Sequence, residues 1–199
     1  MANTPSSIDT FRRNFSGGNR THRYNVTMDF PSGVGPDRDL NQFFVRAVSL
    51  PPSQVNPIRV PYRGRILKWP GDRVYFPWTI RILDEGGSGS LWEGFQQWSR
   101  KINDHDSNIS NDNWSSWTTD WKVHQEDVTG RTVKTVTLHD VWPTVVGPIT
   151  LDSNSIDTLV EFTVTVEYQW FTLGSGGSGS IDDTGDEPVP PDAEPPDVG

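Results

Sequence analysis

The sequence contains no cysteine. This absence excludes disulfides, thiolate metal sites and cysteine catalysis, and it fits folding in a reducing compartment. Long apolar runs are missing as well. None approaches the ~20 residues that a membrane-spanning helix needs, and the N-terminus lacks the apolar stretch of a secretory signal peptide. Hydrophobic residues make up only 33% of the 199 residues, but nine are Trp, so we expect aromatic side chains to dominate the core of one domain.

Catalytic motifs are also absent: the chain has no P-loop, no G-x-S-x-G elbow and no H-E-x-x-H motif. His139 and Asp140 are neighbours on a predicted strand and point to opposite faces, so they are not expected to share a site. His105 lies in a polar loop, where a solvated residue is favoured over a metal ligand. Glu161 and Glu167 are roughly 20 Å apart by strand rise, whereas a glycosidase pair needs about 5–10 Å. We therefore predict no enzyme activity and no metal or cofactor.

Charge is distributed unevenly along the chain, whose net charge is −9. Residues 1–73 carry eleven Arg/Lys and five Asp/Glu, whereas residues 74–199 carry six Arg/Lys and twenty-one Asp/Glu. Seven of these acidic residues lie beyond residue 180. Opposite charge on two regions of one subunit favours head-to-tail contacts between copies.

The most regular stretch is TLVEFTVTVEYQWF, residues 158–171. Strict alternation of apolar and polar residues predicts one β-strand with one face in the core and the other in water. The predicted core face consists of Val160, Phe162, Val164, Val166, Tyr168 and Trp170. The predicted wet face includes Glu161, Thr163, Thr165, Glu167 and Gln169. Burial of the core face would contribute on the order of 10–15 kcal/mol before the entropy cost.

Two hairpins are predicted elsewhere. Residues 24–30 and 40–50 are strand-like, and the short turn region between them predicts an antiparallel pair. Residues 121–126 and 132–141 flank a turn at Thr129-Gly130 and predict a second hairpin. We expect Trp142-Pro143 to end it, because proline lacks the donor that a ladder needs.

A helix is predicted at residues 91–103. Ser90 and Glu93 have the spacing of a capping box. Leu91, Phe95, Trp98 and Ile102 then form one apolar stripe that should pack on a sheet.

The tryptophans raise the alternative of a carbohydrate-binding face. Trp98 falls on the helix stripe and Trp170 on the predicted core face, so core packing is the favoured interpretation. Trp114 and Trp117 remain as candidates for exposed aromatic residues.

Residues 53–73 are predicted to leave the domain as a β-hairpin arm that starts after Pro51-Pro52 and returns as a strand at residues 74–83. Pro77 in that returning strand indicates an edge or a bulge. The arm carries Arg59, Arg63, Arg65, Lys68 and Arg73, opposed only by Asp72. Contact with an acidic surface of another copy is the favoured interpretation. A nucleic-acid-binding module that uses residues 59–73 to contact phosphates is the alternative of another class, and a solvated loop is the plainest one.

Three segments follow from the composition. Residues 1–19 are expected to hold a short helix, and residues 20–173 to form the β-domain with the arm (51–73) and the helix (91–103). The remainder, 174–199, reads as a Gly/Ser linker and an acidic, proline-rich tail that cannot bury enough apolar surface to fold.

Short motifs occur along the chain in a defined order. They are Leu50-Pro51, Gly71-Asp72-Arg73, Trp78-Thr79, Phe95-x-x-Trp98 and Trp142-Pro143. In this order and spacing, over about residues 20–171, the chain resembles the tail tube proteins of contractile-tailed bacteriophages.

The resemblance implies a mainly β fold, an antiparallel sandwich or partial barrel with one flanking α-helix and an extended hairpin arm. It further implies hexameric rings stacked into a tube inside a contractile sheath, with DNA passing through the lumen without specific binding. Implied partners are further copies of the chain, the sheath, the baseplate and the tail terminator, but no membrane. The protein would belong to the virion tail and be assembled in the host cytoplasm.

Site residues follow from the same resemblance. In such proteins the arm reaches an adjacent ring, which makes contact candidates of Arg59, Arg63, Arg65, Lys68, Asp72 and Arg73. The wet face supplies the lumen candidates Glu161, Thr163, Thr165 and Glu167. An inner-tube subunit of a DNA-free injection system, such as a tailocin, remains the alternative within the same class.

Overall fold

The computed structural model describes residues 8, 10, 12, 19–35, 44–84, 86 and 90–175. Its elements are β1 (Tyr24–Met28), β2 (Val45–Ala47), β3 (Ser53–Tyr62), β4 (Arg65–Tyr75), β5 (Trp78–Leu83), α2 (Leu91–Ile102), the short 3-10 helix η2 (Trp114–Ser116), β6 (Thr119–Glu126), β7 (Thr132–Val146), β8 (Glu161–Glu167) and β9 (Trp170–Ser175). No helix among these residues is long and apolar enough to cross a membrane.

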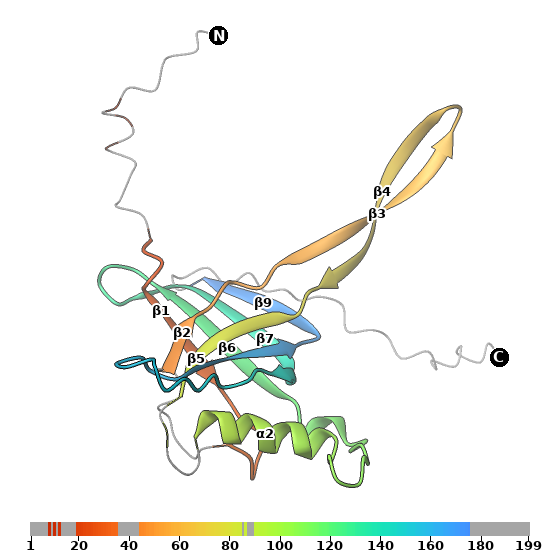
Figure 1. The fold of residues 1–199 in the computed structure, drawn as a ribbon. Coiled ribbons are helices and arrows are strands. Elements are labelled where there is room, and N and C mark those ends of the chain that lie inside the picture. The colour runs from red at the N-terminus through yellow and green to blue at the C-terminus, as the bar shows by residue number, and fades with distance from the viewer. Residues whose placement is uncertain are drawn as a thin grey trace, which may run out of the picture.

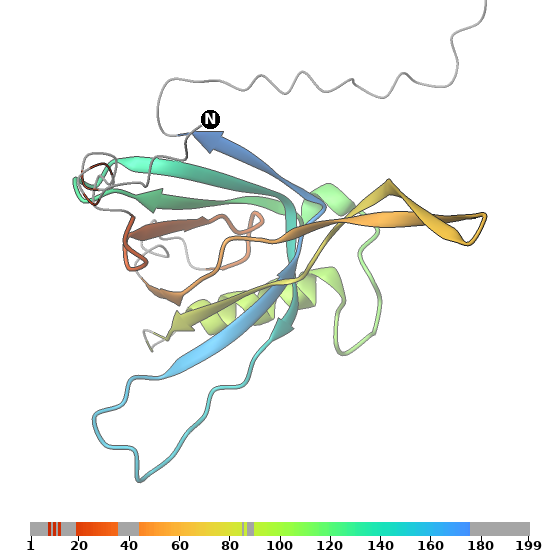
Figure 2. The same cartoon turned by 90° about the horizontal axis from the view of Figure 1, so that it is seen from above.

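The body is an antiparallel sheet that curves into a nearly closed barrel (Figures 1 and 2). Its strand order is β1-β6-β7-β8-β5-β2, and β9 also pairs with β7. The two ends of this order approach each other, because the Tyr24 hydroxyl donates a 3.0 Å hydrogen bond to the Val45 carbonyl. The predicted mainly β architecture with one flanking helix is confirmed.

The first predicted hairpin is wrong. β1 pairs with β6, and β2 pairs with β5, so the two strands lie at opposite ends of the strand order. Alternation of apolar residues shows which face of a strand is buried, but it does not specify the partner strand. β1 and β2 therefore lie on either side of the seam of the barrel and do not form a hairpin.

β7 pairs with strands in both halves of the barrel. Its first part pairs with β6 and β9, and its last part pairs with β8. Asp140 lies between these parts with a positive φ of 56°, which marks a local bend. The prediction that Trp142-Pro143 ends the strand is wrong: the ladder continues to Val146, and a register shift after Pro143 accommodates the missing N–H.

The stretch 158–171 forms two strands instead of one. β8 ends at Glu167, and the chain bends at Gln169, whose N–H donates to the His139 carbonyl. Beyond the bend Trp170 is 45% exposed and stacks on His139, so its predicted place on the core face is wrong. Phe171 packs against the core in its stead. The remaining predicted core residues of this stretch are half-buried or buried.

The helix matches its prediction and covers the barrel from below in the view of Figure 1. Ser90 caps it by accepting a 3.4 Å hydrogen bond from the Glu93 N–H. The stripe of Leu91, Phe95 and Trp98 is fully buried. Phe95 contacts the rings of Trp121 and Phe162 at centroid distances of 6.1 and 6.3 Å. Aliphatic residues are more numerous in the core, but its five largest fully buried side chains are aromatic: Trp78, Trp98, Trp121, Phe95 and Phe162.

Two further predictions concern the exposed tryptophans and the ends of the domain. Trp117 is buried and its indole N–H donates to the Asn111 carbonyl, so only Trp114 of that pair is exposed. β9 extends to Ser175, two residues into the predicted linker. The rest of the predicted linker and tail lies outside the described residues, as does most of the predicted N-terminal helix, of which Ile8, Thr10 and Arg12 are described and helical.

Candidate assembly surfaces

The arm is a free-standing two-stranded sheet. β3 and β4 pair only with each other, and the turn between them consists of Arg63 and Gly64, both with positive φ. The hairpin projects far from the barrel (Figures 1 and 2). Every residue of β3 is exposed. An isolated hairpin is only marginally stable in water, and no other strand in the described part of the chain pairs with this one.

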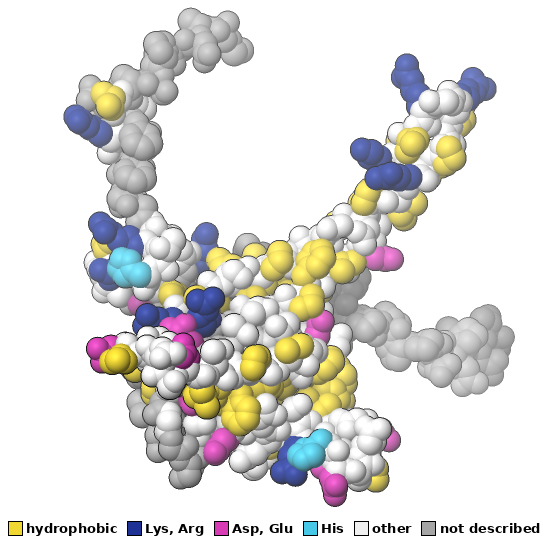
Figure 3. All heavy atoms as spheres, in the orientation of Figure 1, with side chains coloured by type: hydrophobic (Ala, Val, Ile, Leu, Met, Phe, Trp, Pro, Cys, Tyr) yellow, Lys and Arg dark blue, Asp and Glu magenta, His cyan; other side chains and the backbone are white. Residues whose placement is uncertain are grey.

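The register of the hairpin separates two faces, because directly opposed residues share a face. One face carries five large apolar side chains that are 45–65% exposed: Ile58, Val60, Tyr62, Leu67 and Trp69. On the other face Arg59 lies opposite Lys68, and Pro61 lies opposite Ile66. The arm is therefore amphipathic. Figure 3 shows its apolar side chains in yellow and its cations in dark blue.

The predicted contact residues lie at two levels of the arm. Arg63 occupies the turn, with its guanidinium 5.4 Å from the centroid of the Tyr62 ring, and Arg65 is paired opposite Tyr62. Asp72 and Arg73 lie nearer the base, where Arg73 donates a 3.0 Å hydrogen bond to the Ser53 hydroxyl. Four of the six predicted residues thus lie in the outer half of the hairpin. The apolar face was missed, although its alternating signal is present between the prolines of β3.

An aromatic cluster fixes the base of the arm. Tyr75, at the end of β4, packs on Tyr168 and Phe171 at centroid distances of 5.8 and 5.5 Å. The Tyr168 hydroxyl reaches the carbonyl of Pro52, just before β3, at 3.5 Å. Burial raises the pKa of Tyr168 above its ordinary value. Tyr168 therefore contacts the chain at both ends of the hairpin, just before β3 and at the end of β4.

The predicted wet face lies on the side of β8 away from the core. Glu161 pairs with Arg46 at 3.2 Å and with Arg81 at 3.9 Å. Thr165 shares a 2.9 Å hydrogen bond with the Thr79 hydroxyl of β5. Arg46 and Arg81 compensate the carboxylate of Glu161, so this face is closer to neutral than its two glutamates alone indicate.

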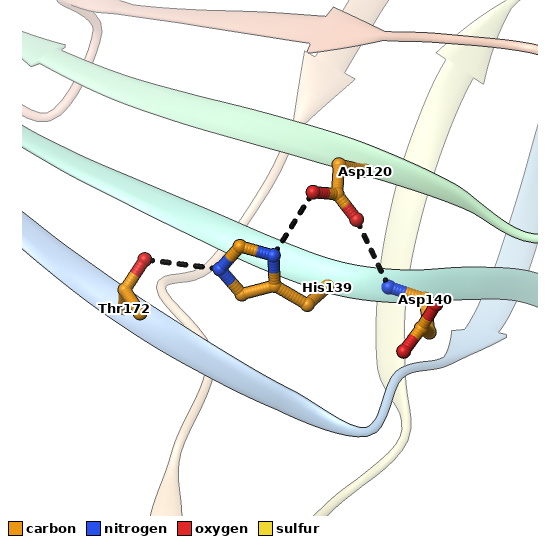
Figure 4. A network of polar contacts seen from close by, with 4 residues as sticks. All are labelled: Asp120, His139, Asp140 and Thr172. Atoms are coloured by element: carbon orange, nitrogen blue, oxygen red, sulfur yellow. Dashed lines mark hydrogen bonds and ion pairs between the residues drawn. The ribbon is translucent and has the colours of Figure 1, made fainter. Parts of the chain in front are cut away.

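A polar network ties three strands together (Figure 4). Asp120 of β6 lies 2.9 Å from Nδ1 of His139 in β7, and Nε2 of His139 lies 3.1 Å from the Thr172 hydroxyl in β9. The other Asp120 oxygen accepts the Asp140 backbone N–H. Asp140 thus meets the network through its backbone. The described residues include no cluster of three His, Cys, Asp or Glu side chains that could hold a metal ion.

A groove of about 710 Å³ lies beside the long connection from β7 to β8, residues 147–160. Its lining includes Arg46, Leu151, Asp152, Asp157, Leu159 and Glu161. Leu151 and Leu159 are 82% and 66% exposed. No sequence argument pointed to this surface, because the connection resembles an ordinary polar turn.

The subunit combines a free-standing arm, a nearly closed barrel and one flanking helix. Residues 19–173 match the family model described as phage tail tube protein. The chain belongs to the phage tail tube protein family. It is accordingly a structural component of the phage tail, a class of protein without a catalytic role.

Individual relatives agree with this family. The chain is 29% identical over 168 residues to a tail tube protein of Serratia phage KSP90, covering 82% of this chain and 94% of that one. A tail tube protein of Enterobacteria phage T4 is 25% identical over 130 residues, 65% of this chain and 79% of its own.

Two solved structures share the fold. One is from the six-fold symmetrised baseplate of the anti-feeding prophage, with a TM-score of 0.61 and 14% identity, covering 81% of this chain and 99% of that one. The other comes from the sheath-tube complex of an extracellular contractile injection system, with a TM-score of 0.58 and 15% identity over 85% and 99% of the two chains.

Proposed function

We propose that this tail tube protein assembles into rings of six that stack into the inner tube of a contractile tail. The amphipathic arm carries the proposal. Its apolar face, with cations at its tip, is 45–65% exposed in the isolated subunit and is suited to contact another copy. Contacts between copies would also cover exposed strand edges: among the described strands of the barrel, β1, β2 and β9 pair on one side only.

The wet face of β8 is the proposed lumen wall. Glu161, Thr163, Thr165 and Glu167 present carboxylates and hydroxyls, and a polar face without excess positive charge would let DNA pass without adhering. The sheath surrounds this tube, with the baseplate and the tail terminator at its two ends. Assembly takes place in the host cytoplasm.

The other predicted functions are less well supported. The family match favours a phage tail over a DNA-free injection system. A nucleic-acid-binding arm would leave five large apolar side chains on one of its faces uncovered, because phosphates bind cations and not aliphatic surface.

Charge reversal at the arm tip tests the proposal. We expect Arg63→Glu/Arg65→Glu to fold normally by circular dichroism and to form rings, but to give few or no tubes in negative-stain microscopy. A matched control is Arg131→Glu/Lys134→Glu, which reverses two exposed cations at the β6–β7 hairpin. Tubes of normal length from the arm variant would show that the arm makes no axial contact.

A further inference from the structure

We infer that the groove beside residues 147–160 receives the arm tip of a second copy of the chain. This inference rests on the proposed tube assembly and names the surface that the arm meets. Both surfaces are exposed in the isolated subunit, and their chemistry is complementary.

The groove combines apolar surface with negative charge. Leu151 and Leu159 are largely exposed, and Asp152, Asp157 and Glu161 lie beside them. Arg46, the one cation of the lining, is paired with Glu161 at 3.2 Å, so the net negative charge of the lining comes from Asp152 and Asp157. A ligand for this surface should therefore carry apolar side chains together with positive charge.

The arm tip has both properties. Tyr62 and Leu67 lie on its apolar face, and Arg63 and Arg65 stand at or next to the turn. The sequence from residue 53 to residue 71 contains no acidic residue. Seating this tip in the groove would cover the two leucines and place two guanidinium groups beside the carboxylates of the lining.

Asp152 of the groove is held in place before any contact. Asp152 accepts hydrogen bonds from the Asn154 N–H at 2.9 Å and the Ser155 hydroxyl at 3.2 Å. These bonds hold the pKa of Asp152 below its ordinary value, because they stabilise the ionised carboxylate. A preorganised carboxylate loses little conformational freedom on binding a cation.

The arm that fills the groove belongs to another copy. The hairpin and residues 147–160 leave the barrel in different directions, as both views show (Figures 1 and 2). Among the described residues, β3 and β4 pair only with each other. One chain therefore does not place its own arm in its own groove.

Cysteine crosslinking tests this contact directly, because the native chain has no cysteine. A Leu67→Cys/Leu159→Cys variant should form disulfide-linked multimers when assembled and oxidised, since a disulfide needs Cα atoms within about 7 Å. The control is Leu67→Cys/Leu173→Cys, whose second position is a 68% exposed leucine on β9. If tubes of the Leu67→Cys/Leu159→Cys variant crosslink no better than tubes of the control variant, the inference is overturned.

Exchanging the charges of the two surfaces tests the groove assignment separately from the arm contact. We expect Asp152→Lys/Asp157→Lys to reduce tube yield about tenfold or more, and combination with Arg63→Glu/Arg65→Glu to restore it. Normal tubes from the aspartate variant and none from the arginine variant would refute the groove as receptor and leave the arm contact intact. Normal tubes from both variants would refute the arm contact itself and the groove with it.

Discussion

Phe95 lies at the centre of the aromatic core, in contact with Phe30, Trp98, Trp121 and Phe162. Its side chain is fully buried. Because its removal leaves a cavity among rigid rings, Phe95→Ala should lower the free energy of unfolding by about 3–5 kcal/mol. Urea denaturation of the unassembled subunit measures this change. Ile109→Ala, at a 69% exposed position, is the control and should stay within about 0.5 kcal/mol of the parent.

Asp127 controls the turn between β6 and β7. It accepts hydrogen bonds from the Thr129 hydroxyl and N–H and from the Arg131 N–H. These bonds, that of the Thr129 hydroxyl foremost, lower the pKa of Asp127 below its ordinary 3.8. Their contribution to stability is therefore complete above that value and is lost as the pH falls through the folded-state pKa.

Carbon-detected NMR titration checks this assignment. The Asp127 carboxyl should titrate below its ordinary range, and Thr129→Ala should bring its pKa back up. An unchanged titration in Thr129→Ala would assign the shift to the backbone donors instead.

At the scale of elements, Tyr168 links the arm to the barrel. Tyr168→Ala should loosen the hairpin without unfolding the subunit, because the packing of Tyr75 on Tyr168 at its base is lost. A dye on Leu67→Cys would report this as a lower fluorescence anisotropy of the unassembled subunit. Tyr168→Phe keeps the ring and should preserve the anisotropy. A fall of equal size in Tyr168→Phe would assign the effect to the hydroxyl and its contact with Pro52.

Elements with local signals were predictable from the sequence. The helix has its cap and stripe within a dozen residues, and the arm has its flanking prolines and its central Arg63-Gly64 turn. Strand partners are set by tertiary packing, which is why the pairing of β1 with β6 was missed. The break at Gln169 was missed for the same reason. Alternation continues through the bend, but the partners change from β5 and the last part of β7 to the first part of β7.

For the whole molecule, the two faces of the arm give a sharp test of self-association. Leu67 lies on the apolar face and Ile66 on the opposite one, with exposures of 56% and 61%. Leu67→Ser should reduce assembly in sedimentation velocity, whereas Ile66→Ser should have little effect. Neither change should alter the stability of the isolated subunit by more than about 0.5 kcal/mol, since both side chains are exposed. Equal effects of the two changes would mean that both faces are buried in the tube.

The candidate surfaces could be predicted only in part from the sequence. Arg59, Arg63, Arg65 and Lys68 were recognised because charge is a property of residue type. The apolar face appears only when β3 and β4 are placed in register. The groove requires Arg46, which is more than 100 residues away in sequence, to lie beside residues 150–161.

The pairing of β1 with β6 also governs the order of events during synthesis. Tyr24 pairs with Gln125, so β1 emerges from the ribosome about 100 residues before its partner, a wait of about 5–20 s at ordinary elongation rates. During this time Val26 and Met28, buried in the finished barrel, have no sheet to cover them. The seam between β1 and β2 therefore closes late, and translation speed sets the period in which the nascent chain is most exposed to misassociation with its neighbours on a polysome.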